Sequence, residues 1–167
     1  MNHPRRRATL TCLAPGLLTA ALPAVSAAAY PDKPIRLVVP FPPGQGADIL
    51  ARLIGQHLAA ALGQPIVVEN KVGAGGIIGT AFAAKAAPDG YTLYMGSSGP
   101  LAIGPHVYKA VGFDTLKDFA PISNIASVTQ VLVTAPASQL ASAKDVVERA
   151  RAQPGMVPFG SAGSGTT

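Results

Sequence analysis

The sequence predicts an α/β protein built on a parallel sheet with helical crossovers. Short apolar runs recur along the chain, and each is followed by a loop rich in glycine and small polar residues. Segments with apolar residues at helical spacing follow the first two of these runs. Strands that alternate with helices form parallel sheets, whose ligands bind beyond the carboxyl ends of the strands.

The first strand and helix are predicted between residues 35 and 62. Ile35–Val39 is apolar apart from one arginine, which is typical of a strand buried on both faces. A loop of prolines and glycines follows, because neither residue type continues a sheet or a helix interior well. Asp48 stands at the N-cap or in the first turn of a helix whose apolar residues continue to Leu62, and Gly63 ends it.

The same unit then repeats. Ile66–Val68 is predicted as a second strand, Asn70–Gly76 as a glycine-rich loop and Ile77–Ala87 as an alanine-rich helix. Thr92–Met95 is predicted as a third strand, which runs into the small residues Gly96–Gly99. Three strands that end in such loops, two of them followed by helices, place the loops along one edge of a single sheet.

Beyond the third strand the pattern is weaker but continues. Ile122–Ile125, Val128–Thr134 and Val157–Ser161 are predicted as further strands. A helix is predicted over Ala143–Ala152, with Ser142 as its N-cap. The linker before this helix, from Thr134 to Ser142, is the predicted boundary between two lobes.

The first 29 residues have the order of regions that defines a secretory leader. Arg5–Arg7 precede a mostly apolar stretch that ends in small residues, and cleavage after Ala27 or after Ala29 fits equally well. The consecutive arginines also permit export by the twin-arginine route, so the general secretory route and the twin-arginine route both remain open. Cys12 lies before most of the apolar region and is interpreted as part of the leader.

The charge and the cysteine count exclude several classes of function. The chain has 13 basic and 8 acidic residues, and three of the basic residues are Arg5–Arg7, so the rest carries 10 minus 8, or +2. Nucleic-acid binding calls for a basic patch or stripe, which is missing after residue 7, so no nucleic-acid partner is predicted. Cys12 is the one cysteine, so disulfides and thiolate chemistry are not predicted beyond the leader, and neither a metal nor a cofactor is expected.

The strand-end loops are rich in backbone N–H donors. Glycine lets the backbone approach a ligand closely, and successive amides present several donors to one anion. The loops with this composition are Pro42–Asp48, Asn70–Gly76, Gly96–Gly99 and Gly160–Thr167. They predict a site for a carboxylate or phosphate that needs no cationic side chain. Asp48 is the carboxylate expected beside this site, where it would cap its helix or orient a ligand ammonium or a water.

The same loops contain two features that resemble those of nucleotide-binding proteins and of enzymes. Gly73–Gly79 has the spacing of a phosphate loop only superficially, because no Lys-Ser or Lys-Thr pair follows, so nucleotide binding is not predicted. A secreted α/β hydrolase is the alternative function, with Ser97 or Ser98 as nucleophile and His106 as base. A structural role for His106 is favoured over a role as base, and His57 is interpreted as a surface residue.

Six segments, spread in order over the chain beyond the leader, carry a resemblance to a known family. They are Y-P-D-K-P-I-R at 30–36, F-P-P-G-Q-G-A-D at 41–48, V-E-N-K-V-G-A-G-G at 68–76, P-D-G-Y-T-L at 88–93, G-S-S-G at 96–99 and F-G-S-A-G-S-G at 159–165. In these segments the sequence resembles the Bug-type extracytoplasmic solute receptors of the tripartite tricarboxylate transporter family. The resemblance implies a type II periplasmic-binding-protein fold, in which two α/β lobes close over a ligand.

The resemblance also implies how the chain divides. Residues 1–29 would be the signal peptide, residues 30–134 the first lobe without its C-terminal return, and residues 135–167 the start of the second lobe. The chain is therefore expected to be truncated, with the first lobe mostly present and the second only begun. A fragment of the receptor without binding function is a further alternative.

The function implied is that of a periplasmic receptor, not an enzyme, which captures a small carboxylate for a membrane permease or a sensor kinase and is a monomer when complete. In the family, backbone amides and ordered waters hold the ligand carboxylate. The positions that match are Pro42, Pro43, Gly44, Gln45, Gly46, Ala47, Asp48, Ser97, Ser98, Gly99, Ser161, Ala162, Gly163, Ser164 and Thr166.

This sequence departs from the family pattern at two places. Gln45 replaces the second of two consecutive glycines in the first loop, and Pro100–Gly104 stands where a Thr-rich segment is usual. Both changes lie beside the expected ligand, so its identity is left open.

Overall fold

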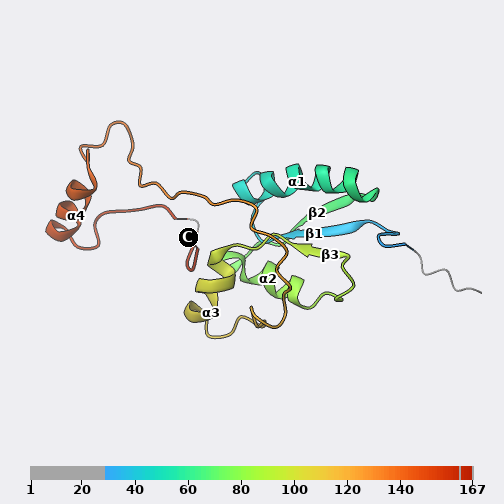
Figure 1. The fold of residues 1–167 in the computed structure, drawn as a ribbon. Helices are drawn as coiled ribbons and strands as arrows, with labels where there is room; N and C mark the ends of the chain where they lie inside the picture. The colour runs from blue at the N-terminus through green and yellow to red at the C-terminus, as the bar shows by residue number, and fades with distance from the viewer. Residues whose placement is uncertain (1–28, 162, 167) are drawn as a thin grey trace, which may run out of the picture.

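A parallel sheet of three strands forms the centre of the molecule. The computed structural model describes residues 29–161 and 163–166, and Figure 1 shows their arrangement. The strands β1 (Ile35–Val39), β2 (Ile66–Asn70) and β3 (Thr92–Tyr94) lie in the order β2-β1-β3. Val39 pairs with Asn70 and Val38 with Tyr94, so the three strands end near one edge. The predicted parallel α/β sheet is confirmed.

One helix covers each face of this sheet. α1 (Gly46–Leu62) packs on β1 and β2, whereas α2 (Ile77–Ala84) packs on β1 and β3 from the opposite side (Figure 1). β1 is the central strand and is covered on both faces, which explains its continuous apolar run. Its residues Ile35, Val38 and Val39 are fully buried.

The ends of the two helices differ in part from the prediction. α1 begins at Gly46, with Gln45 as its N-cap, so Asp48 lies in the first turn, which is one of the two positions predicted for it. Gly63 ends α1 as predicted: it has a φ of 67° and donates its N–H to the carbonyl of Ala59. α2 ends at Ala84, three residues before the predicted end, and Lys85 is its C-cap.

A helical segment after β3 was not predicted. One π-helical turn over Gly99–Ile103 leads directly into the short helix α3 (Gly104–Val107). Pro100 and Pro105 each lie in the first turn of their helix, where the missing N–H costs no hydrogen bond.

The chain beyond residue 119 leaves the sheet. The predicted strands at Ile122–Ile125, Val128–Thr134 and Val157–Ser161 are wrong, since none of these segments forms a strand. Within the described part of the chain no neighbouring strand supplies hydrogen bonds to them, and side chains such as Val133 and Phe159 are 76% and 86% exposed. A strand sequence without a partner strand stays extended coil.

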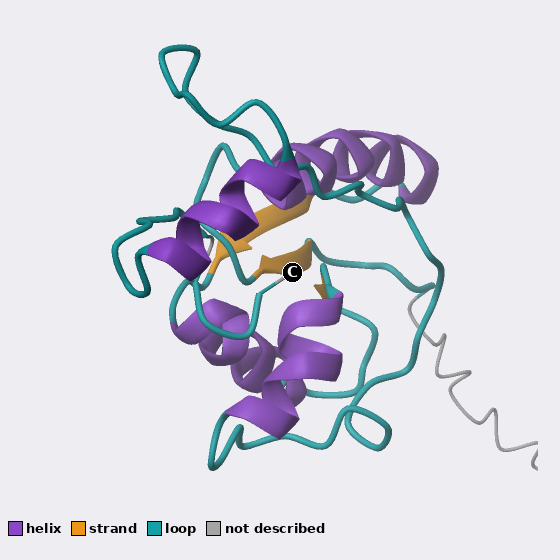
Figure 2. Ribbon diagram, turned by 90° about the vertical axis from the view of Figure 1, so that its left-hand side faces the viewer, coloured by secondary structure: helices purple, strands orange, loops and turns teal. Residues whose placement is uncertain are grey.

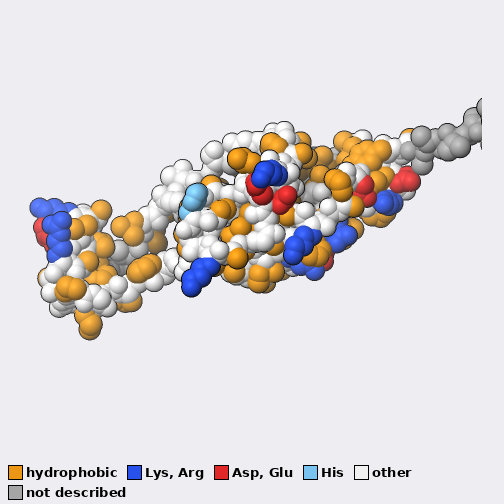
Figure 3. Space-filling view, turned by 90° about the horizontal axis from the view of Figure 1, so that it is seen from below, with side chains coloured by type: hydrophobic (Ala, Val, Ile, Leu, Met, Phe, Trp, Pro, Cys, Tyr) orange, Lys and Arg blue, Asp and Glu red, His pale blue; other side chains and the backbone are white. Residues whose placement is uncertain are grey.

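The helix predicted after this linker is present. α4 spans Ala143–Ala152 and starts at Ser142 as predicted, yet none of its residues is buried. It lies away from the sheet, on an outlying part of the molecule (Figure 1), and Figure 2 views the molecule from this side. Hydrophobic side chains show on the surface of that part (Figure 3).

The predicted leader, residues 1–29, lies outside the described residues except for Ala29. Among the helices that are described, none is long and apolar enough to cross a membrane.

Candidate functional site

The candidate site lies where the connections from the sheet diverge. β1 and β3 are neighbours, but the helix after β1 covers one face and the helix before β3 covers the other. The crevice beyond the carboxyl ends of two such strands is where ligands bind in open α/β sheets. Here the loop after β1, residues 40–45, and the loop after β3, residues 95–98, follow the carboxyl ends of these two neighbouring strands.

Two buried prolines and a glycine bring the strand-end loops together. Pro40 follows β1, Pro100 follows β3, and both are fully buried. A Cβ placed on Gly76, in the loop after β2, would lie 3.2 Å from Pro100 Cγ and 3.4 Å from Pro40 Cβ. Gly76 also has a φ of 97°, which L side chains rarely adopt. Packing around Pro40, Pro100 and Gly76 therefore holds the loops after the three strands in fixed positions relative to one another.

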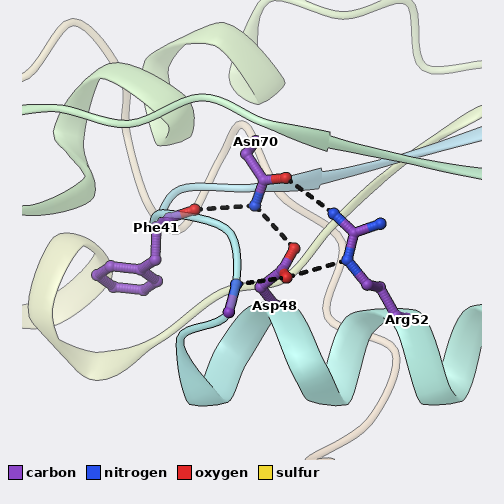
Figure 4. Close-up of polar contacts among 5 residues, drawn as sticks. Phe41, Asp48, Arg52 and Asn70 are labelled. Atoms are coloured by element: carbon purple, nitrogen blue, oxygen red, sulfur yellow. Dashed lines mark hydrogen bonds and ion pairs between the residues drawn. The ribbon is translucent and has the colours of Figure 1, made fainter.

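A polar network holds the shape of the first loop (Figure 4). The Asp48 carboxylate accepts hydrogen bonds from Gly44 N (2.8 Å) and Arg52 Nε (3.0 Å) through one oxygen, and from Asn70 Nδ2 (2.9 Å) through the other. Asn70 Nδ2 also donates to the carbonyl of Phe41 at 2.9 Å, and Asn70 Oδ1 accepts from Arg52 Nη2 at 3.2 Å. The network ties the loop after β1 to the end of β2.

The electrostatics of this network favour the charged carboxylate. The Asp48 side chain is 3% exposed, and its hydrogen bond with Arg52, followed by those with Gly44 and Asn70, holds its pKa well below the usual range. The same hydrogen bond raises the pKa of Arg52. Because both Asp48 oxygens are occupied, its role is to hold the loop, and contact with a ligand stays a prediction.

The predicted residues of the first loop are mostly exposed. Pro42, Pro43, Gly44, Gln45 and Gly46 are exposed, and Ala47 is half-buried. The Gln45 side chain gives α1 no cap hydrogen bond. The first N–H groups of α1 therefore keep their capacity to donate to a ligand, at the end of the helix where its dipole favours a negative charge.

The second predicted segment follows β3, the strand next to β1. Ser97 is half-buried, Ser98 is exposed and Gly99 is buried at the start of the π-helical turn. Ser98 gives this turn no side-chain cap bond. Both hydroxyls are therefore available as donors at a second helix start.

The third predicted segment comes from the far end of the chain. Ala162 lies outside the described residues, and Ser161 and Gly163–Thr166 form a turn in which Thr166 Oγ1 donates to Gly163 O at 2.6 Å. This turn lies against the loop after β2, since a Cβ built on Gly75 would lie 2.6 Å from Ser164 O, and against the end of α3, where Tyr108 Oη donates to the carbonyl of Ser164 at 2.9 Å.

Several residues of this edge were not among the predicted site positions. Arg52 stands four residues after Asp48 on α1, a spacing at which two side chains meet, so it could have been found from the sequence. The role of Asn70 depends on its pairing with Val39, and that of Tyr108 on the return of the chain end. Neither leaves a signal in the sequence.

The residues of the hydrolase alternative are not assembled. His106 is exposed on α3 and borders a shallow hollow with Leu101 and Phe113. Within the described residues it makes no hydrogen bond with Ser97 or Ser98, and no group of three His, Cys, Asp or Glu residues is placed to hold a metal ion. His57 is exposed on α1, as predicted.

A parallel sheet with one helix on each face and donor-bearing loops at the strand ends is the architecture of a lobe of the periplasmic-binding-protein class. The sequence comparison gives the family: residues 50–167 match the model of the tripartite tricarboxylate transporter family receptor. The chain belongs to this family. The predicted family is thereby confirmed.

Individual relatives agree with this assignment. The chain is 46% identical to the Bordetella pertussis protein BugT over 81% of its own length and 42% of that protein. It is 38% identical to a protein of the tcbD-tcbE intergenic region of Pseudomonas sp. strain P51, over 97% of this chain and 48% of the relative. The chain thus spans less than half the length of these relatives.

Solved structures show the same fold. A structure described as a periplasmic transporter matches with a TM-score of 0.75 and 44% identity, over 81% of this chain and 45% of that one. The R. palustris protein Rpa4515, solved with adipate, matches with a TM-score of 0.77 and 35% identity, over 82% of this chain and 46% of that one. MatC of Rhodopseudomonas palustris, solved with bound malate, matches at 0.55 and 38%, over 57% and 33%. The hydrolase alternative gains no support from these proteins.

Proposed function

We propose that this chain is the ligand-entry part of a periplasmic receptor that binds a small carboxylate without turning it over. The observation that carries the proposal is the pair of helix starts without a side-chain cap, at Gly46 and Gly99, that follow the neighbouring strands β1 and β3. Anions bind where such N–H groups converge. Adipate and malate in the structures of two relatives agree in chemistry with this site.

The proposed contacts follow the loops. Backbone N–H groups of Gly46–Asp48 and the hydroxyls of Ser97 and Ser98 would hold one carboxylate, directly or through water, which is nearly as favourable as a direct bond. The turn at Ser161–Thr166 would cover the ligand from the other side. The positions in these loops are the fifteen predicted from the sequence.

We also propose the division of the chain that these roles require. Residues 1–29 serve as the export leader, by either route, residues 30–134 form the first lobe, and residues 135–167 begin the second lobe. The complete receptor works as a monomer and passes its ligand to a membrane permease or a sensor kinase. Closure of the lobes is a hinge motion that the ligand favours through contacts made in the closed form.

A thermal-shift and calorimetry screen of the chain with adipate, malate and inorganic phosphate tests the proposal. Ligand that binds the folded state raises the unfolding midpoint. We expect millimolar adipate or malate to raise it and phosphate to have less effect. No shift with either dicarboxylate, or a shift with phosphate alone, would overturn the carboxylate assignment.

Gly46→Ala tests the place of the site. A Cβ at Gly46 meets no atom within 4 Å, and its φ is not positive, so the variant should fold unchanged. Its methyl group would stand at the start of α1, where the carboxylate is proposed to bind. Gly160→Ala also adds a Cβ in open space and is the matched control. Equal binding by both variants would place the ligand elsewhere.

A further inference from the structure

The turn at the end of the chain touches the sheet-bearing part through Tyr108. This residue follows α3 directly, and its hydroxyl donates to the carbonyl of Ser164 at 2.9 Å. Its ring also flanks the turn, since a Cβ built on Gly165 would lie 3.2 Å from Tyr108 Cε2. The tyrosine therefore contacts the turn by both its ring and its hydroxyl.

Gly75 completes the contact from the other side. A Cβ at this position would lie 2.6 Å from the carbonyl oxygen of Ser164 and 3.5 Å from Thr166 Cγ2. Real side chains essentially never come as close to a backbone atom as the first of these distances. The approach of the turn thus depends on the absence of a side chain at Gly75. We call Gly75 and Tyr108 together the seat.

The seat joins two parts of the chain that few other interactions connect. Residues 120–142 run between them as exposed coil and turns. Within the described residues, the Tyr108–Ser164 bond is the one hydrogen bond that connects residues 29–119 to residues 141–166. No ion pair of the described residues connects them. The position of the turn therefore depends on the seat.

We propose that the seat is a closing contact of the receptor, and that Tyr108 is a positioning residue that sets how tightly the closed form holds its carboxylate. The inference rests on the proposed function, because the turn that the seat holds is the one proposed to cover the ligand. A contact made only in the closed form adds its free energy to closure without touching the ligand. It should change the lifetime of the complex more than its rate of formation.

Tyr108→Phe and Gly75→Ala test the two halves of the seat. Phenylalanine keeps the ring and removes the hydrogen bond, so adipate affinity should fall roughly two- to tenfold. The alanine at position 75 should cost more, because its methyl group collides with the Ser164 carbonyl. Gly63→Ala is the matched control: Gly63 has a φ of 67°, close to the 62° of Gly75, but a Cβ there meets no atom within 4 Å. It carries the same backbone strain without the collision.

The rates separate a closing role from a merely structural one. For Tyr108→Phe we expect faster dissociation of adipate, an unchanged association rate, an unchanged preference between adipate and malate, and an unchanged unfolding midpoint of the free protein. Equal dissociation rates in the variant and the parent chain would overturn the proposal. A lower midpoint with unchanged rates would do the same, since it would make the residue part of the packing alone.

A second measurement separates failure of the seat from failure of the proposed function. A nuclear Overhauser effect between the Tyr108 ring and the Gly165 α protons reports the seat in the chain without ligand. If the parent chain binds no carboxylate, the proposed function fails, yet this signal still decides the contact. Its presence in the parent, without ligand or after adipate is added, and its loss in Gly75→Ala support the seat, whereas its absence in the parent under both conditions overturns it.

Discussion

Helices α1 and α4 begin alike and are held in place by different means. Each has an aspartate as its third residue, Asp48 in α1 and Asp145 in α4. Asp145 forms a complete capping box with Ser142, whose hydroxyl accepts from Asp145 N while the Asp145 carboxylate accepts from Ser142 N. Asp48 instead accepts from the preceding loop, from Arg52 and from a neighbouring strand.

The two helices show that capping and placement are separate problems. α4 has the better cap and buries none of its residues, whereas α1 lacks a side-chain cap and buries Asp48, Ala51 and Gly55. A capping box satisfies the first N–H groups locally, wherever the helix lies. The bonds of Asp48 join three segments, so they also fix where α1 and its loop stand relative to the sheet. The proposed site lies at the start of α1, the helix whose position these bonds fix.

The largest expected effect compares one residue type in the two parts of the chain. Ile35 is fully buried in β1, whereas Ile122 is 83% exposed in the outlying coil. Ile35→Ala should lower the free energy of unfolding by about 2–5 kcal/mol. Ile122→Ala should change it by about 0.5 kcal/mol or less. Urea unfolding followed by far-ultraviolet circular dichroism measures both.

Similar losses in the two isoleucine variants would break the comparison, because they would mean that residues near 122 are packed as well as the sheet. A loss confined to Ile35→Ala would sharpen it, and would show that the sheet with its two helices carries the cooperative stability.

The next largest effect concerns the two aspartates. Asp48→Asn should lower the unfolding midpoint by roughly 5–10 °C, since it weakens bonds that connect separate segments. Asp145→Asn should reduce the helical signal of α4 and leave the midpoint in place. Differential scanning calorimetry, together with the dichroism at 222 nm, distinguishes the two results. A fall in midpoint with Asp145→Asn would contradict the separation of α4 from the core.

The pH dependence of stability follows from the same residue. The pKa of Asp48 is lowered in the folded state, first by the hydrogen bond with Arg52, so the folded protein holds the carboxylate charged. Its contribution is fully present above the unfolded carboxyl pKa of about 3.9 and is lost as the pH falls through the folded value. Asp48→Asn should therefore have a flatter loss of stability below about pH 4. A steeper loss would contradict the network.

The same distinction explains what the sequence could predict. The apolar run of β1, the glycine that ends α1 and the serine that starts α4 are local signals, and each led to a correct element. The network at Asp48 was missed because Asn70 reaches it through the register of β2 on β1. No local pattern encodes that register.

The predictions of strands beyond residue 119 were wrong for a related reason. Val128–Thr134 has the composition of a strand, but strand formation requires a partner that donates and accepts hydrogen bonds. Val131, Leu132 and Val133 are 71–76% exposed, and the described part of the chain offers them no such partner. For the site, composition located the donor-rich loops, while the contact of the last turn with Tyr108 required the three-dimensional path of the chain.

A smaller effect is expected from the hydroxyl of Tyr94, at the border of β3 and α2. It lies 2.5 Å from Thr80 Oγ1, and burial raises its pKa to about 12. The unfolded chain ionises near pH 10, so stability due to this group falls as the pH rises from about 10 toward 12. Tyr94→Phe should remove this pH-dependent part of the stability. An ultraviolet titration of phenol ionisation, with the unfolding midpoint measured at each pH, tests it.

If Tyr94→Phe lacks the phenol group that ionises at the highest pH in the parent chain, that group belongs to Tyr94. This result would place Tyr94 in the packed part of the molecule. A titration of the variant that matches that of the parent chain would show that Tyr94 is open to water, which would contradict its burial between β3 and α2.

The smallest effect tests α4 alone. Ser142→Ala removes the N-cap, which costs a helix about 1 kcal/mol. A helix of ten residues is marginal without packing, so its population should fall and the dichroism at 222 nm with it. Ser123→Ala changes an exposed serine of the same outlying part and is the control. Because α4 buries none of its residues, the cooperative transition should stay where it is in both variants. A lower midpoint in Ser142→Ala alone would mean that α4 packs on the sheet-bearing part, so the contrast between the two helices would have to be given up.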